Sequence, residues 1–560
     1  MKAKIRGNAP TVGGMSRRSF LAATAAASVA ANTSASAANA SVDPSRKPGT
    51  LASGDAQAVV TKAGPIAGYT RDGVRIFKGI PYGATTAGAA RFKPAQPLAP
   101  WHEVRSSRAY GPVCPQGARS GWQNDAEAFL MRWDDGFPGE DCLRLNVWTS
   151  APQGRKLPVM VWLHGGGFTA GSGQELPAYD GENLARSGQV VLVSVNHRLG
   201  PLGFLNLSAY GEEFADSANV GMLDLVLALQ WVRDNIASFG GDPSNVTIFG
   251  QSGGGAKVTT LTAMPTAQGL FHKAIVQSGS FPMSTSVAQS ASLAEALLEE
   301  LGLTQADFRK LQEIPSDQLL AAGARATQRI GGPRPEFLGR GPLPLGWSPT
   351  IDGRTIAVPP FSPEAVKASP SIPMLIGSTR DEFGMQLRGD PRWSEAQVLE
   401  RMQLAYGATS PQIYAAFKRQ YPNENPGGVL AIITSMALRN NALNQASARQ
   451  ANGNAPAFVY WFTYLTPSLD SKPGAFHCAD LPFCFDNVER CDSSTGNTEA
   501  ARRLGTLMSR AWINFARTGN PSQPGLAWPK FDAQQMPTMI FDVDSRVEND
   551  PAGEVRRMVV

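Results

Sequence analysis

The chain has 560 residues, of which 42% are hydrophobic and 17% are charged. This composition predicts a globular protein with enough apolar material for a large core. There is no fixed-period repeat and no stretch of 18 apolar residues, which argues against a solenoid and against a membrane anchor. The 51 Lys and Arg outnumber the 46 Asp and Glu, for a formal net charge of +5.

The first 40 residues have the pattern of an export signal. A basic front end leads to the twin-arginine sequence SRRSFL (Ser16 to Leu21), and an Ala-rich apolar run follows. Small residues then offer cleavage after Ala37 or Ala40, as in a bacterial Tat signal peptide; the alternative is a disordered basic tail. We expect residues 1–40 to be removed, residues 41–56 to form a flexible leader, and residues 57–560 to form a single domain that is periplasmic or secreted.

The signal accounts for the whole excess of positive charge. Residues 1–40 hold five Lys and Arg and no Asp or Glu, so the remainder has 46 basic residues against 46 acidic ones. A formally neutral chain gives no reason to expect nucleic acid as a partner.

Continuous apolar runs predict the strands of a parallel sheet that is covered on both faces. These runs lie at 157–163, 189–196, 245–249, 273–278, 373–378, 457–462 and 538–542. Between the second and third runs, Leu225, Leu229, Val232 and Ile236 share one face of a predicted helix. The β-α-β alternation predicts an open, doubly wound α/β sheet. The Gly- and Pro-rich stretch 331–347 interrupts it and predicts a loop over the molecule that covers a site.

The cysteines give no metal signal. They are Cys114, Cys142, Cys478, Cys484 and Cys491. No CxxC motif or zinc-ligand spacing occurs, and export permits disulfides. Because the first two stand apart from the last three, we expect a Cys114–Cys142 bridge and at most one pair among the others.

The glycine-rich stretch VTIFGQSGGGAKV (Val246 to Val258) follows a predicted strand and permits two readings. A phosphate-binding P-loop needs Lys directly after the second glycine of G-x-x-x-x-G, but Ala256 stands there and Lys257 comes one place late. The G-x-S-x-G pattern fits as GQSGG, with Ser252 on the sharp strand-to-helix turn of a nucleophile elbow. Gly250 and Gly254 give the turn room, and an ordinary tight turn is the plain alternative.

A nucleophilic serine needs a histidine base, which follows it in chain order in this class of elbow. The five histidines are His102, His164, His197, His272 and His477. Only His272 and His477 follow Ser252, and His272 leaves no room for an acid-bearing strand between them. His477 lies on a loop after a predicted strand, where a base is well placed.

The acid that orients the base should also follow a strand between Ser252 and His477. The sequence PMLIGSTRDEFG offers Asp381 and Glu382, and composition does not choose between them. The glycine run HGGGF (His164 to Phe168) offers backbone N–H groups for an oxyanion hole, and Gly253 adds another.

At this point the chain resembles the type B carboxylesterase/cholinesterase-like family. The segments EDCLRLNVW (Glu140 to Trp148), FKGIPYG, CPQ, NHRLG, FHKAIVQSGS and WINFARTGNP match that family in order, over nearly all of residues 57–545. Two departures stand out, because the usual G-E-S-A-G is here G-Q-S-G-G. Gln251 removes a charge beside the nucleophile, and Gly253 replaces an alanine but keeps its N–H.

The resemblance implies an α/β-hydrolase fold with a mostly parallel central sheet, long loop insertions over the active site, and ester hydrolysis without metal or cofactor. It implies Ser252 as nucleophile, Glu382 as acid and His477 as base. It also implies oxyanion donors at Gly166, Gly167 and Gly253 and a Cys114–Cys142 disulfide.

The expected function is therefore that of a serine carboxylesterase acting on a small-molecule ester. The alternatives are hydrolysis of a carbamate, amide or thioester, and a non-catalytic cholinesterase-like binding protein. Trp122 and Trp133 lie in a loop that borders the substrate gorge in the family. A pocket-lining role and a core or surface role are both open for them.

Overall fold

The computed structural model describes residues 58–117, 125–152, 154–282, 285–332, 345–382, 384–388 and 393–559, all within one compact unit, residues 51–560. The predicted signal peptide, the leader, Trp122 and most of the 331–347 loop lie outside the described residues. The predictions for these segments therefore remain predictions.

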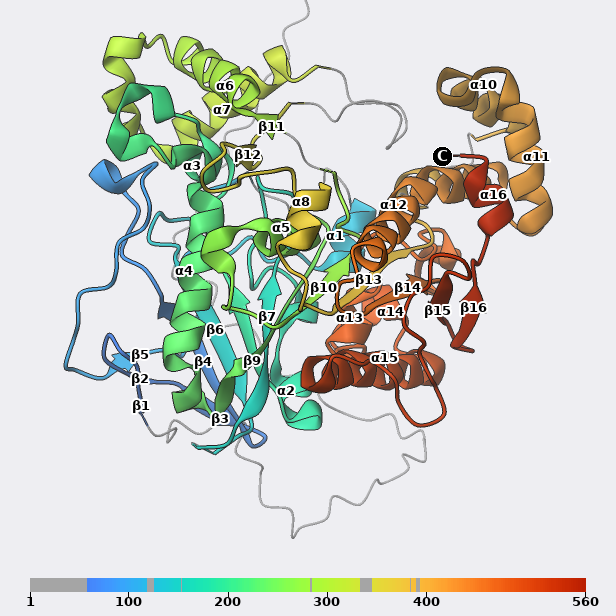
Figure 1. The fold of residues 1–560 in the computed structure, drawn as a ribbon, viewed down its shortest axis with the longest axis horizontal. Helices are drawn as coiled ribbons and strands as arrows, with labels where there is room; N and C mark the ends of the chain where they lie inside the picture. Colours follow the sequence, from blue (N-terminus) through green and yellow to red (C-terminus); the bar gives the residue numbers. More distant parts are fainter. Residues whose placement is uncertain are drawn as a thin grey trace, which may run out of the picture. The chain divides into compact units, whose positions relative to one another are not determined.

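A mixed sheet of eleven strands forms the centre of this unit (Figure 1). In spatial order the strands are β16 (Arg546–Asn549), β15 (Pro537–Phe541), β14 (Ala457–Phe462), β13 (Met374–Thr379), β10 (Lys273–Gln277), β9 (Gly241–Gln251), β7 (Leu157–Leu163), β8 (Val191–Val195), β6 (Arg144–Thr149), β4 (Val74–Pro81) and β3 (Tyr69–Arg71). The seven strands from β15 to β8 are mutually parallel and are the seven that the apolar runs predict.

The sheet edges differ from the sequence-based expectation. On one side β16 pairs antiparallel with β15, and on the other β6, β4 and β3 continue the sheet in antiparallel pairs. Strands β3, β4 and β16 are only partly buried, so they lack the continuous apolar runs by which the central strands were recognised. Short strands outside the main sheet are β1 (Val59–Val60), β2 (Pro65–Ala67), β5 (Arg105–Ser106), β11 (Thr285–Ser286) and β12 (Thr350–Ile351).

Helices cover both faces of the sheet. Successive side chains along β7 point to opposite faces, and each face packs into a different apolar core. Val159 and Val161 pack into one apolar core with the helix face predicted from Leu225 and its neighbours, whereas Trp162 packs into a second core with Trp512. The two cores therefore place α4 (Val220–Asn235) and α15 (Glu499–Thr518) on opposite faces. A third core lies among α10, α11, α12 and α16, which lie together at one end of the unit (Figure 1).

The remaining helices have the following bounds. They are α1 (Asp125–Met131), α2 (Glu182–Gly188), α3 (Gly200–Phe204), α5 (Gly253–Ala263), α6 (Val287–Glu300), α7 (Ser316–Ile330), α8 (Pro363–Lys367), α9 (Gly384–Leu387), α10 (Glu395–Tyr406), α11 (Ser410–Gln420), α12 (Pro426–Ala451), α13 (Leu481–Cys484), α14 (Asp492–Thr495) and α16 (Gly553–Arg557).

The parallel strands place three sequence-predicted residues at one edge of the sheet. Ser252 directly follows β9, Glu382 follows β13, and His477 lies on the segment after β14. Because β9, β10, β13 and β14 are neighbours and parallel, their carboxyl ends meet at this edge. Such edges are where open α/β sheets place their binding sites.

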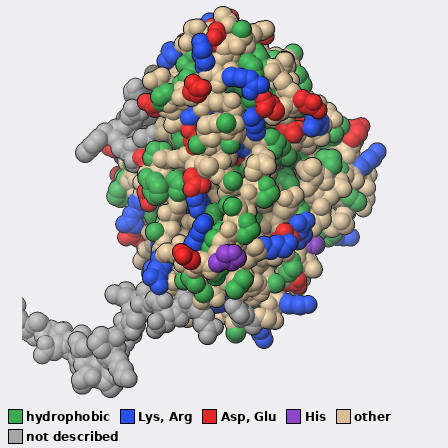
Figure 2. Space-filling model, turned by 90° about the vertical axis from the view of Figure 1, so that its left-hand side faces the viewer, with side chains coloured by type: hydrophobic (Ala, Val, Ile, Leu, Met, Phe, Trp, Pro, Cys, Tyr) green, Lys and Arg blue, Asp and Glu red, His purple; other side chains and the backbone are tan. Residues whose placement is uncertain are grey.

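Surface charge is mixed, as expected for a formally neutral domain. On the face shown in Figure 2, Lys and Arg side chains alternate with Asp and Glu side chains, and neither sign forms a continuous patch. This face offers no extended basic surface of the kind that binds nucleic acid.

Candidate active site

Ser252 occupies a strained turn between β9 and α5. Its φ of 57° and ψ of −124° are a conformation that non-glycine residues rarely adopt. Its backbone N–H donates to the Gln277 carbonyl at 2.8 Å, and its own carbonyl accepts from Ala256 N–H at 3.0 Å. The neighbouring strand and the first turn of α5 therefore hold this conformation in place.

Close backbone packing explains the small residues around the turn. A Cβ on Gly250 would lie 2.5 Å from the Gly254 carbonyl carbon, and a Cβ on Gly254 would overlap the Leu163 carbonyl oxygen. A Cβ on Gly253 would lie 2.5 Å from the Gly167 backbone nitrogen. At each of these positions the backbone of the turn lies too close to another backbone segment for a side chain to fit. These segments are the start of α5, the end of β7 and the glycine run after β7.

Glu382 and His477 are in direct contact. Glu382 Oε2 lies 2.5 Å from His477 Nδ1, and Glu382 Oε1 accepts a hydrogen bond from Thr379 N–H at 2.9 Å. The carboxylate is fully buried, while the imidazole keeps 27% of its surface exposed. The end of β13 thus fixes one carboxylate oxygen and leaves the other for the ring.

Asp381, the other acid that the sequence offered, faces a different set of partners. Its carboxylate lies 2.9 Å from Arg380 Nε and accepts a hydrogen bond from Ala475 N–H at 2.9 Å. It also lies 3.5 Å from Arg388 Nη1. Asp381 therefore anchors the segment two residues before His477, and the carboxylate at the ring belongs to Glu382.

The other histidines lie away from this contact. His272 directly precedes β10, and its Nδ1 accepts from Val246 N–H at 3.1 Å. His164 and His197 are buried and stacked, with ring centroids 5.0 Å apart. The imidazole of His477 is the one that the Glu382 carboxylate contacts.

The charges around His477 favour its protonated form. Burial lowers the pKa of the imidazole, but the charge and hydrogen bond of Glu382 outweigh this, and the pKa lies above 6.5. Asp480 and Glu127 add smaller contributions of the same sign. Such a ring readily accepts a proton, which suits a general base that also forms an imidazolium.

Asp480 belongs to a buried polar cluster that sequence reasoning missed. Its Oδ2 accepts hydrogen bonds from Tyr460 at 2.7 Å and from Gln277 Nε2 at 3.1 Å. Burial raises the pKa of this carboxyl to about 6. Its position three residues after His477 was the only sequence signal that could have identified it.

The glycine run and the elbow face each other. Gly166 and Gly167 have positive φ values of 80° and 63°, which glycine adopts without strain. None of the hydrogen bonds among the described residues uses their N–H groups. Gly253 is the first residue of α5, where N–H groups lack intrahelical acceptors. Gly253, directly after Ser252, therefore packs against Gly167, and Gly166 directly precedes Gly167 in the run.

Gln251 and Cys478 also contact the site, and sequence reasoning had not connected them. Gln251 Nε2 lies 3.2 Å from His477 Nε2, and Cys478 Sγ donates to Gln251 Oε1 at 3.1 Å. The sequence signal for Gln251 was its place directly before the serine, where a polar side chain can reach the residues around the turn.

None of the five cysteines forms a disulfide in the structure. The predicted Cys114–Cys142 disulfide is therefore absent from it, although both thiols are buried. A hydrogen bond with Cys114, together with burial, raises the pKa of Cys142 well above its usual value. The pair is in contact and reduced.

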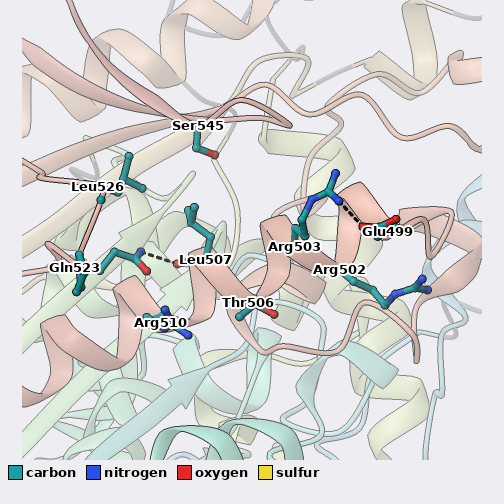
Figure 3. Close-up of a pocket in the computed structure, with 11 residues that line it drawn as sticks. Glu499, Arg502, Arg503, Thr506, Leu507, Arg510, Gln523, Leu526 and Ser545 are labelled. Carbon is teal, nitrogen blue, oxygen red and sulfur yellow. Dashed lines mark hydrogen bonds and ion pairs between the residues drawn. The ribbon is translucent and has the colours of Figure 1, made fainter.

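The part of the chain that the structure describes lacks the marks of a metal centre and of a membrane-spanning helix. Within it, no group of three or more His, Cys, Asp or Glu could hold a metal ion, and no helix is both long and apolar enough to cross a bilayer. A shallow cavity of about 530 Å³ lies on α15 and contains none of the residues predicted for catalysis (Figure 3). Arg502, Arg503 and Arg510 line it, with Arg503 paired to Glu499.

Comparison with known proteins identifies close similarities over almost the whole chain. Residues 55–556 match the model of the carboxylesterase family. The chain is 37% identical over 505 residues to a para-nitrobenzyl esterase of Bacillus subtilis (strain 168), with 90% of this chain and 98% of the relative covered. It is 35% identical over 502 residues to a phenmedipham hydrolase of Pseudarthrobacter oxydans, covering 88% and 96%.

Solved structures give the same result. A PNB esterase is similar with a TM-score of 0.75 at 35% identity, covering 90% of this chain and 99% of the other. An esterase from anaerobic Clostridium hathewayi that can hydrolyse aliphatic aromatic polyesters has a TM-score of 0.77 at 36% identity, covering 90% and 98%.

Proposed function

This chain belongs to the carboxylesterase family and is a carboxylic ester hydrolase with the α/β-hydrolase fold, and from that premise we propose that it acts through an acyl-enzyme on Ser252. His477 is the general base and acid, and Glu382 orients it. The observation that carries the proposal is the contact of Glu382 Oε2 with His477 Nδ1, 2.5 Å apart, at the sheet edge where Ser252 stands on its strained turn.

In the first step, His477 Nε2 takes the hydroxyl proton while Ser252 Oγ attacks the ester carbonyl carbon. Glu382 keeps the proton on Nδ1, so that Nε2 is the free acceptor, and its charge stabilises the imidazolium that forms. The raised pKa of His477 follows from the same contact.

The negative charge that develops on the carbonyl oxygen needs fixed donors. We assign this role to the N–H groups of Gly166, Gly167 and Gly253; the close contact of Gly253 with Gly167 and the positive φ values of Gly166 and Gly167 support the assignment. His477 then gives its proton to the leaving alcohol. In the second half, it activates water, which attacks the acyl-serine and releases the acid.

Substitution of the serine tests this proposal. Ser252→Ala should reduce turnover of p-nitrophenyl esters by about 10⁴-fold or more, because the nucleophile is lost. Ser292→Ala, which changes an exposed serine on α6, is the matched control and should leave turnover unchanged. Ser252→Ala turnover within about tenfold of the wild type would overturn the assignment.

The substrate is proposed to be a small-molecule carboxylic ester. The named relatives act on different compounds, so a panel of aryl, alkyl and polyester substrates should also contain carbamates, amides and thioesters. The best kcat/KM among these classes identifies the physiological bond type. If the folded protein hydrolyses none of these substrates, the result would favour a non-catalytic binding protein.

We also propose that residues 1–40 direct export and that Cys114 and Cys142 form a disulfide afterwards. The twin-arginine sequence at Arg17 and Arg18 supports the first proposal, and the contact between the two thiols supports the second. Replacing both arginines with lysine should retain the protein in the cytoplasm of the expressing cell, whereas the unchanged chain should be exported.

A further inference from the structure

Lys257 lies beneath the proposed oxyanion site, in a position that the reaction steps above do not use. It stands on α5, five residues after Ser252, and its side chain is fully buried. Lysine is almost never fully buried unless its ammonium has a partner, because removing the charge from water is costly. The groups that its ammonium contacts therefore indicate which part of the structure Lys257 stabilises.

The side chain touches both ends of the glycine run. Its ammonium donates a hydrogen bond to the His164 carbonyl at 2.8 Å, directly before the three glycines. The same ammonium lies 5.6 Å from the centre of the Phe168 ring, directly after them, within the range of a cation–π contact. One side chain on the helix of the nucleophile thus holds the run between its two ends.

Backbone contacts join the same helix to the same run one turn earlier. A Cβ on Gly253 would lie 2.5 Å from the Gly167 nitrogen, and a Cβ on Gly254 would lie 2.9 Å from the His164 carbonyl oxygen. The start of α5 therefore packs against the run without intervening side chains. Glycine residues alone do not fix such a loop, because they permit many conformations.

The charge of Lys257 acts on the nearby imidazole of His197. Burial lowers the pKa of His197 well below its usual value, and the charge of Lys257 lowers it further. His197 stacks on His164, whose carbonyl the ammonium holds. The ammonium of Lys257 thus places its charge at the base of the run, beside an imidazole whose pKa it lowers.

We propose that Lys257 is a positioning residue that holds the glycine run, Gly165 to Gly167, at the distance from Ser252 that oxyanion stabilisation needs. It acts through the His164 carbonyl and Phe168 and does not touch substrate. The inference rests on the proposed function, because it assigns a support to the donors named there. Its loss should lower kcat and leave KM nearly unchanged, since the donors are used most strongly in the transition state.

The test is Lys257→Met, which keeps most of the apolar stem and removes the ammonium. Active sites are first counted by titration with a p-nitrophenyl phosphonate, so that kcat refers only to folded, reactive enzyme. We expect kcat to fall by about 100-fold, as for a misplacement of about 1 Å, with KM within about threefold. Affinity for a trifluoromethyl ketone, whose hydrate mimics the tetrahedral intermediate, should fall by a similar factor.

Lys273→Met is the matched control. Lys273 is also buried, but it begins β10 at the opposite end of the strand from the site. This variant should keep wild-type kcat per titrated site even if its stability falls. A wild-type kcat per site in Lys257→Met would overturn the inference, as would a loss confined to the number of active sites.

A second variant keeps the inference testable if Lys257→Met does not fold. Lys257→Gln retains an N–H donor for the His164 carbonyl without the charge, and we expect kcat per site to fall by about fivefold or more. Wild-type kcat in this variant would overturn the inference. Phosphonate labelling of Ser252 in the unchanged enzyme is independent of both variants, so failure of this inference is distinguishable from failure of the proposed function.

Discussion

Gln251 Nε2 lies almost equally far from the two ring nitrogens of His477, at 3.2 Å from Nε2 and 3.3 Å from Nδ1. If the amide nitrogen lay in the plane of the ring at these two distances, it would overlap the ring carbons. It therefore lies over the face of the imidazole. Cys478 Sγ donates to the amide oxygen at 3.1 Å and so favours the orientation with the NH₂ group toward the ring. The edge of the ring at Nδ1 faces Glu382.

This contact predicts the effect of Gln251→Glu on pH dependence. The base must be neutral, and the Glu382 carboxylate raises its pKa, so kcat/KM of the unchanged enzyme should fall on the acid side at a higher pH than the pKa of an ordinary histidine. A carboxylate over the ring would stabilise the imidazolium and move this limb to higher pH. At pH 6 we expect about a tenfold lower kcat/KM than in the unchanged enzyme, with similar values at pH 9.

Gln251→Met, which removes the polar group without adding charge, is the control for that experiment. Its acid limb should stay close to that of the unchanged enzyme. The groups whose charge reaches His477 are Glu382, Asp480 and Glu127, and all three remain in both variants. An unchanged profile in Gln251→Glu would show that the side chain at position 251 does not face the imidazole in solution.

The two adjacent acids predict opposite phenotypes. Glu382→Gln removes the carboxylate at His477 Nδ1 and should lower kcat by about 10³- to 10⁴-fold, with little effect on folding. Asp381→Asn removes the buried negative charge that lies beside Arg380 and Arg388. It should therefore lower the free energy of unfolding by about 3 kcal/mol. Its kcat per titrated site should stay within about tenfold.

Urea unfolding and active-site titration together separate these two effects. Equal losses of kcat per site in the two variants would contradict the division of roles, as would a larger loss in Asp381→Asn.

Gly253→Ala tests the close approach of the elbow to the glycine run. The new Cβ would lie 2.5 Å from the Gly167 nitrogen, so the run must move away from the serine. We expect kcat to fall by about tenfold with KM little changed, measured with p-nitrophenyl acetate. Gly269→Ala, at a turn with open space around its Cβ, controls for glycine replacement at another position, and it should keep kcat. Full activity in Gly253→Ala would show that the run accommodates the methyl group.

Exported protein should contain a Cys114–Cys142 disulfide. Peptide mapping without reductant should recover the two cysteines in one cross-linked fragment, and the double variant Cys114→Ser/Cys142→Ser should unfold about 3 kcal/mol more easily than the oxidised enzyme. Both cysteines are buried and adjacent, so the bridge needs little rearrangement. Recovery of both as free thiols from exported protein would contradict the prediction.

The sequence was most informative where one physical constraint dominates. The seven parallel strands are buried on both faces, so continuous apolar runs identified all of them, and the bounds of β7 and β14 agree with the structure. The antiparallel edge strands β4 and β16 are only partly buried, so their sequences contain no such run. In β9, the extension back to Gly241 passes through Pro243, a residue typical of strand ends and not of strand interiors.

Side-chain direction was the main quantity that the sequence left open. Asp381 and Glu382 are neighbours of the same charge, and only the turn after β13 decides that Glu382 faces the imidazole and Asp381 the arginines. Lys257 was informative only as a misplaced P-loop lysine. The structure adds that it lies in a helix whose residues are all buried, so its side chain serves the interior.

The most direct test of the central claim is to trap the acyl-enzyme or its phosphonate mimic on a defined residue. The enzyme is incubated with a fluorophosphonate, digested, and mapped by mass spectrometry alongside Ser252→Ala. We expect one label per chain on the peptide that contains Ser252, loss of esterase activity in proportion to labelling, and no label in the variant. Labelling at another residue, or esterase activity that persists in fully labelled enzyme, would contradict it.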